Sequence, residues 1–281
     1  MTTSATPRTS PVLDLSGETT PIRSLVRDLW QRRGLIRMLA AKDFHGRYRS
    51  ASLGVLWSVA LPLLQGAVLA VVFTKVVRID LSRGLSYPVF VVSGTVLWGY
   101  TSSSILAGST VLVDQGQIAS KVYFPRLVLP FVPATANFVS FSLSVLVLLP
   151  IMIVTDTPFR LSLVVLPLVM ALLYVLVVIV GALVAMLHVY FRDTRYIVQA
   201  TLLVALYATP VIYPFERAME YRWFLIANPA TGPLNLGRWA IFGEGVYVLP
   251  SVLSTLAWCV VLALTTLVVY RRRERIAMDR L

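Results

Sequence analysis

Three basic side chains stand close together in the segment KDFHGRYR, residues 42–49, just before a long run without charge. These are Lys42, Arg47 and Arg49. Ammonium and guanidinium groups bind anions, and a guanidinium can do so through two parallel hydrogen bonds. The segment therefore predicts contact with an anionic group at a membrane surface, either an ordinary lipid headgroup or a specific ligand.

Catalytic and metal-binding patterns are absent from the sequence. The two histidines, His45 and His188, lie far apart without ligand-spaced partners, and the single cysteine, Cys259, lies in an apolar run. The sequence has no G-x-x-x-x-G-K-[ST] phosphate loop and no paired-carboxylate motif. We therefore expect the chain itself to bind no metal and no cofactor.

The composition indicates lipid rather than water as the main solvent. Of 281 residues, 57% are hydrophobic and only 14% are charged, whereas a soluble domain carries about 25% charged residues. The formal charge of +12 is typical of nucleic-acid partners, but the basic residues lie beside and between apolar runs rather than on one folded face. Nucleic acid is therefore not expected as a partner.

Six stretches without charge are long enough to cross about 30 Å of hydrocarbon as helices. They lack the period-2 alternation of a membrane β-barrel. The predicted fold is all-α and integral to the membrane. The six spans are expected near residues 55–77, 88–108, 130–154, 162–187, 197–215 and 248–270.

The basic residues also predict an orientation. Most of the 25 Lys and Arg residues fall on one side of the six spans, and this excess marks the cytoplasmic side. Both termini are therefore expected in the cytoplasm. The basic residues assigned to the outer side are Lys75, Arg78, Arg83, Arg160, Arg217, Arg222 and Arg238.

The predicted spans contain Lys75 but no acidic residue. Carriers driven by ion gradients place ionisable groups inside their spans, where these groups bind the coupling ion or relay protons. A proton- or sodium-coupled carrier is therefore disfavoured. If the protein moves its cargo uphill, the energy must come from another chain.

The chain divides into four predicted parts. Residues 1–19 are expected to be a disordered cytoplasmic tail, and residues 20–54 an amphipathic leader lying in the membrane interface. Residues 55–270 hold the six spans, and residues 271–281 form a basic cytoplasmic tail. Between spans five and six, an uncharged segment broken by prolines predicts a re-entrant outer hairpin over residues 217–247, with an amphipathic surface loop as the alternative.

These features resemble one family. The segment KDFHGRYRSASLGVLWSVALPLL, the motif KVYFPR after span two and ANP in the broken hairpin are similar to the membrane subunit of ABC-2 type polysaccharide exporters, the Wzm-like permeases. The similarity covers roughly residues 24–275. Such permeases export O-antigen, teichoic acid or galactan carried on a polyprenyl diphosphate.

The resemblance implies a homodimer in the cytoplasmic (inner) membrane, bound to two copies of a separate nucleotide-binding subunit that holds ATP and Mg²⁺. It places the helix that docks on this partner within residues 114–126, and it makes the hairpin the outer gate. The coupling residues that it implies are Asp114, Gln115, Gln117, Lys121, Tyr123 and Arg126.

A lipid-linked glycan as cargo implies two kinds of contact. Lys42, Arg47 and Arg49 would receive the lipid diphosphate at the cytoplasmic entrance, unless they only anchor the chain to anionic lipid. Aromatic rings would hold sugars through their flat faces, unless they form the aromatic belt of the membrane boundary. The candidate rings are Trp57, Phe73, Trp98, Tyr100, Tyr207 and Tyr213.

Two alternatives stay open on the sequence. The first is an ABC-2 permease for drugs or small lipids, against which the RYR and KVYFPR segments weigh. The second is a membrane glycosyltransferase or phosphotransferase, which needs acid and base groups at a membrane face. Asp43, Asp114 and Asp193 are the acids nearest the spans on that side, and no two are close in sequence.

Overall fold

A computed structural model describes residues 27, 30–49, 52–76, 86–115 and 128–279. Within these residues all regular structure is helical. The predicted tail 1–19 lies outside the described residues, as do Gln117, Lys121, Tyr123 and Arg126 of the predicted coupling segment.

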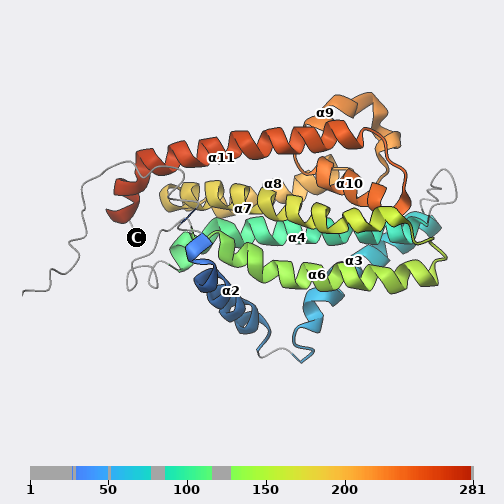
Figure 1. Cartoon of the computed structure of the whole chain (residues 1–281), viewed down its shortest axis with the longest axis horizontal. Coiled ribbons are helices and arrows are strands. Elements are labelled where there is room, and N and C mark those ends of the chain that lie inside the picture. Colours follow the sequence, from blue (N-terminus) through green and yellow to red (C-terminus); the bar gives the residue numbers. More distant parts are fainter. Residues whose placement is uncertain (1–26, 28–29, 50–51, 77–85, 116–127, 280–281) are drawn as a thin grey trace, which may run out of the picture.

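The described helices form one elongated bundle (Figure 1). They are α2 (Arg33–Tyr48), α3 (Leu56–Val71), the π-helical turn η1 (Val72–Val76), α4 (Tyr87–Asp114), α6 (Phe131–Val154), the 3₁₀ turn η4 (Leu161–Val165), α7 (Leu166–Tyr190), α8 (Thr194–Ala208), the 3₁₀ turn η5 (Phe215–Tyr221), α9 (Arg222–Ala227), α10 (Thr231–Phe242) and α11 (Val248–Asp279). Helix α4 is the core of the bundle and packs against α3, α6, α7, α8 and α10.

Five helical segments of the described chain are long and apolar enough to cross a membrane. They are Leu56–Lys75, Tyr87–Asp114, Phe131–Val154, Leu161–Tyr190 and Val248–Tyr270. Each coincides with a predicted span, so the all-α prediction and five of the six spans are confirmed. Helix α11 continues past the predicted boundary at residue 270 and ends at Asp279.

The helix predicted over residues 197–215 was too long. Helix α8 ends at Ala208, and Thr209 takes an extended conformation with φ −101° and ψ 140°. Pro210 explains this end, because proline disfavours helical geometry in the residue before it. The 15 residues of α8 rise about 22 Å, less than the roughly 30 Å of a hydrocarbon core. The connection 209–214, which follows α8, has no helical structure.

The described part of the predicted leader is mainly helix α2. Its apolar residues Leu39 and Ala40 are buried against Val132 and Ala136 at the start of α6. The opposite face carries exposed basic residues such as Arg37. Figure 1 shows α2 leaving the bundle obliquely, near the end at which α11 terminates. The amphipathic pattern thus corresponds to a helix whose apolar face packs against α6.

The segment between α8 and α11, for which a broken hairpin was predicted, contains the two short helices α9 and α10. The chain breaks at Asn228–Ala230, where Pro229 interrupts the helical pattern. Helix α10 is far from being a surface loop, because all of its residues except Leu236 and Trp239 are buried. It packs against α7, α11 and α4, and Figure 1 shows it inside one end of the bundle.

Candidate functional site

Helices α3, α4 and α6 border a groove of about 710 Å³, with Arg47 of α2 beside it. Its lining is mostly apolar but includes six uncharged polar side chains, and we call it the polar groove for these. The polar residues that line it are Ser58, Gln65, Ser103, Asn137, Ser140 and Ser144. Such a surface can accept and donate hydrogen bonds without carrying a fixed charge of its own.

The polar side of α6 follows from its spacing. Asn137, Ser140 and Ser144 are separated by three and four residues, which places them on one helical face. The hydroxyl of Ser144 donates to the carbonyl of Ser140 at 3.0 Å, and that of Ser103 donates to the carbonyl of Tyr100 at 3.3 Å. Their oxygen lone pairs stay available as acceptors. The sequence shows this spacing, but the residues predicted to bind cargo were only basic and aromatic ones, so Asn137, Ser140 and Ser144 were missed.

Arg47 joins α2 to this groove. Its Nη1 donates to Oδ1 of Asn137 at 2.7 Å, and its Nη2 lies 2.6 Å from Oδ2 of Asp43 in an ion pair one helical turn away. The side chain is about one-third exposed, with a relative accessibility of 35%. A guanidinium in this place can meet an anion from solvent, although Asp43 competes for it.

The other two predicted entrance residues are placed differently. Lys42 is exposed on α2, and Arg49 is exposed just after the end of that helix. Neither belongs to the described lining of the groove. Of the three predicted basic residues, the structure brings only Arg47 to the polar groove.

Tyr100 and Trp98 lie on different sides of α4. Tyr100 lines the polar groove, where its ring stacks on Phe141 with centroids 4.5 Å apart, and its hydroxyl donates to the carbonyl of Ala134 at 3.3 Å. Trp98 lines a second groove of about 500 Å³ between α4 and α8, together with Tyr196 and Gln199. The two mid-span aromatic residues therefore do not share one site within this chain.

The remaining predicted aromatic residues are dispersed. Trp57 is exposed in the first turn of α3, whereas Phe73 packs near the ring of Tyr87, with centroids 6.2 Å apart. Tyr207 is exposed on α8, and its carbonyl accepts a hydrogen bond from the hydroxyl of Tyr213 at 3.1 Å. These four residues come from α3, η1, α8 and the connection that follows α8.

Two of the predicted coupling residues are described. Asp114 is exposed as the last residue of α4, and Gln115 follows as its C-terminal cap. The amide oxygen of Gln115 is buried without a hydrogen-bond partner among the described residues. Both residues lie at the C-terminal end of α4, which is the end of the bundle opposite the α9–α10 break (Figure 1). The described chain resumes at residue 128.

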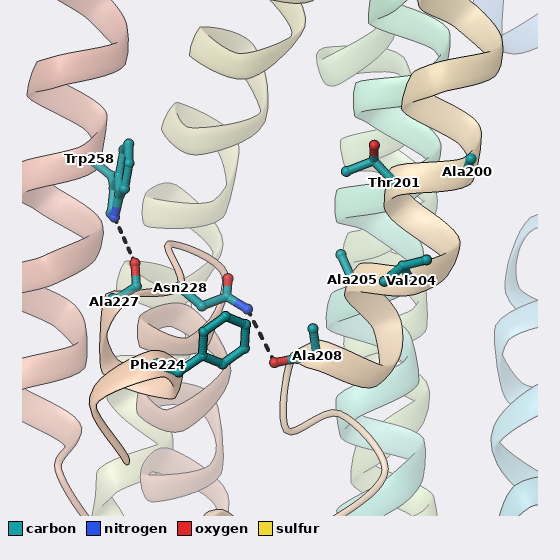
Figure 2. Close-up of a pocket in the computed structure, with 9 residues that line it drawn as sticks. All are labelled: Ala200, Thr201, Val204, Ala205, Ala208, Phe224, Ala227, Asn228 and Trp258. Atoms are coloured by element: carbon teal, nitrogen blue, oxygen red, sulfur yellow. Dashed lines mark hydrogen bonds between the residues drawn. The ribbon is translucent and has the colours of Figure 1, made fainter. Parts of the chain in front are cut away.

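The break between α9 and α10 is held from two sides. Asn228 Nδ2 donates to Oγ1 of Thr209 at 2.9 Å, directly after α8. Trp258 Nε1 of α11 donates to the carbonyl of Ala227 at 2.7 Å, and Thr255 Oγ1 donates to the carbonyl of Pro229 at 2.8 Å. Figure 2 shows Asn228 and Trp258 facing a pocket of about 660 Å³ whose lining is almost entirely apolar.

The sequence assigned Arg238 to the outer side but did not predict its burial. It lies in α10 with 5% of its surface exposed. Its Nη2 donates to the carbonyl of Val211 at 2.6 Å, and its guanidinium carbon lies 3.6 Å from the centre of the Phe90 ring. A buried cation in a membrane bundle is typical of functional sites.

The sequence model of the ABC-2 type transporter family matches residues 34–242, which include both the polar groove and the α9–α10 break. The chain belongs to this family. It is therefore a multi-pass permease of an ABC transporter, whose role is transport rather than catalysis. The described residues contain no group of three or more His, Cys, Asp or Glu side chains that could hold a metal ion.

The ABC-2 permease is similar to curated O-antigen export permeases. It is 32% identical to the O-antigen export system permease protein RfbA of Myxococcus xanthus over 200 residues, which are 70% of this chain and 74% of the relative. Two proteins of the same name from Klebsiella pneumoniae are 28% and 26% identical, over 69% and 75% of this chain and 75% and 81% of their own length. The resemblance inferred from the sequence motifs is thus confirmed.

Proposed function

We propose that this permease exports a polyprenyl-diphosphate-linked polysaccharide across the cytoplasmic membrane, powered by ATP hydrolysis in a separate subunit. The observation that carries the proposal is the polar groove with Arg47 at its border. Its amide and hydroxyl groups suit sugar hydroxyls, and the guanidinium suits a diphosphate. The names of the relatives support O-antigen-like cargo, while teichoic acid and galactan would share the polyprenyl diphosphate carrier.

The proposed arrangement has six crossings, with both termini in the cytoplasm. Helix α8 and the connection 209–214 form the fifth crossing, and the α9–α10 hairpin dips into the membrane from the outer side. The burial of α10 supports this placement, because non-helical backbone is tolerated in a membrane only where protein or water shields it. Two such permeases pair in the inner membrane with two ATPase subunits, and the segment from Asp114 to residue 126 contacts them.

Depletion of the gene tests the proposed cargo. We expect a lipid-linked glycan to accumulate on the cytoplasmic side, because synthesis continues while export stops. Mass spectrometry of extracted lipids identifies the glycan, and re-expression of the wild-type chain should remove it. Absence of any accumulating lipid-linked glycan would contradict the proposal and favour a small-molecule cargo.

Arg47 is expected to bind the lipid diphosphate at the entrance of the groove. The measurement uses the complex reconstituted with its ATPase subunit, in which lipid-linked glycan stimulates ATP hydrolysis. Arg47→Gln should raise the glycan concentration needed for half-maximal stimulation about tenfold or more, because a charge-assisted hydrogen bond to the diphosphate is lost. Arg49→Gln is the matched control, since Arg49 does not belong to the described lining of the groove.

Equal effects of the two substitutions would assign the basic residues to general membrane anchoring. Because Arg47→Gln also removes the bond to Asn137, Asn137→Ala in a separate variant measures that contribution. If Asn137→Ala alone reproduces the loss, Arg47 acts by holding α2 against α6 rather than by meeting the diphosphate.

A further inference from the structure

The guanidinium of Arg238 is buried with only part of its hydrogen-bonding capacity used. Nη2 is bonded to the carbonyl of Val211, and Phe90 covers one face of the group. Its Nε and Nη1 have no hydrogen-bond partner among the described residues. Buried donors without partners are rare and costly, above all on a charged group. This arrangement is therefore expected to be one of two states rather than a permanent one.

The bond partner of Arg238 belongs to the outer connection 209–214, which follows α8. The next carbonyl of this connection, that of Ile212, accepts a hydrogen bond from the hydroxyl of Tyr87 at 2.9 Å. Two side chains from other helices, α10 and α4, thus hold consecutive carbonyls of a segment that has no helical hydrogen bonds of its own there. These two side-chain bonds therefore help to hold the connection against α4.

An alternative partner for Arg238 lies just beyond the connection. Glu216, in the first turn of η5, is exposed, and its carboxylate lies within electrostatic range of the guanidinium. No ion pair between the two side chains occurs in the described structure. A movement of the connection that brought the carboxylate and the unpaired N–H groups together would supply the missing acceptor.

We propose that Arg238 is a two-state latch for the outer end of the permease. In the engaged state, which the structure describes, Arg238 holds the Val211 carbonyl and keeps the connection 209–214 against α4. In the released state, Arg238 pairs with Glu216, and the connection moves away from α4. The proposal rests on the proposed export function, because release opens the outer end for a long polar cargo.

Accessibility of the connection tests the latch. Ile212 is only 9% exposed, so an Ile212→Cys reporter in a Cys259→Ser background should react slowly with a membrane-impermeant maleimide added from outside. The reporter is measured in the full complex with its ATPase subunit, in sealed membranes with and without ATP. ATP is expected to raise the labelling rate, because cycling releases the latch.

Three substitutions separate a latch from a merely structural contact. Arg238→Gln should raise labelling without ATP about tenfold or more, because the charge-assisted bond is lost. Glu216→Gln should leave labelling without ATP unchanged but abolish the rise with ATP, since the released state loses its partner. Glu220→Gln, at another exposed acid of η5, is the matched control and should behave like the wild type.

Two results would overturn the latch: unchanged labelling in Arg238→Gln, or a normal ATP response in Glu216→Gln. If Arg238→Gln does not assemble with the ATPase subunit, the Glu216→Gln arm decides alone, because Glu216 is exposed and its removal leaves the engaged state intact. The test requires no cargo. The latch and the export function can fail separately. A normal ATP response in Glu216→Gln would contradict the latch, and glycan accumulation after gene depletion would still support the export function.

Discussion

Gly94→Ala is expected to abolish export. A Cβ atom at Gly94 would lie 2.5 Å from the carbonyl oxygen of Val211 and 3.4 Å from Nη2 of Arg238. The first distance is shorter than van der Waals contact and involves backbone, so α4 and the connection 209–214 must separate. Overpacking of this kind costs about 1–3 kcal/mol, and separation also weakens the bonds made by Arg238 and Tyr87.

The measurement is the level of lipid-linked glycan in cells that depend on the variant, together with the yield of the purified complex. Gly181→Ala in α7 is the matched control, because its new Cβ would lie 3.8 Å from the Cα of Gly108, an ordinary contact distance. Normal export by Gly94→Ala would show that the outer connection is not held against α4 in the working permease.

Gly232→Ala is expected to have a similarly large effect at the other face of the hairpin. A Cβ atom there would collide with Oγ1 of Thr255 and lie 2.5 Å from the carbonyl oxygen of Ser251. The Thr255 side chain can rotate, but the Ser251 carbonyl belongs to the backbone of α11. Helix α10 must therefore move off α11, which also strains the bond from Thr255 to Pro229.

Thermal stability of the purified complex should fall by several degrees for Gly232→Ala, and export should fall with it. Gly181→Ala is the control, because its Cβ would only approach the Cα of Gly108 at 3.8 Å. The double variant Gly232→Ala with Thr255→Ala removes one of the two collisions. Full recovery in this double variant would contradict the role assigned to the Ser251 carbonyl.

The long spans were predictable because their signal is local. A run without charge of about 20 residues forms a helix in lipid whatever it packs against. Proline also acts locally, which is why the break at Pro229 was anticipated. Pro210 predicts in the same way that α8 ends near Ala208. The span was instead predicted from the length of the run without charge, and this run continues to Phe215.

The site was only partly predictable because it depends on tertiary contacts. Arg47 was identified from its position between the leader and the first span, but its partner Asn137 lies 90 residues away. Arg238 was assigned to the outer side, but a count of basic residues does not tell whether a residue is buried. Its burial follows from the way α10 packs among α4, α7 and α11, which no periodicity in a helix of 12 residues reveals.

The shortness of α8 also affects the lipid around the protein. The connection that follows α8 has carbonyls bonded to Arg238 and Tyr87. Because it packs against protein, it does not lengthen the apolar surface that α8 presents to lipid. In the proposed arrangement with six crossings, lipid beside the exposed apolar face of α8 would meet a hydrophobic band roughly 8 Å shorter than an average bilayer core and would thin to match it. Acyl-chain length thereby becomes a determinant of how this permease sits in its membrane.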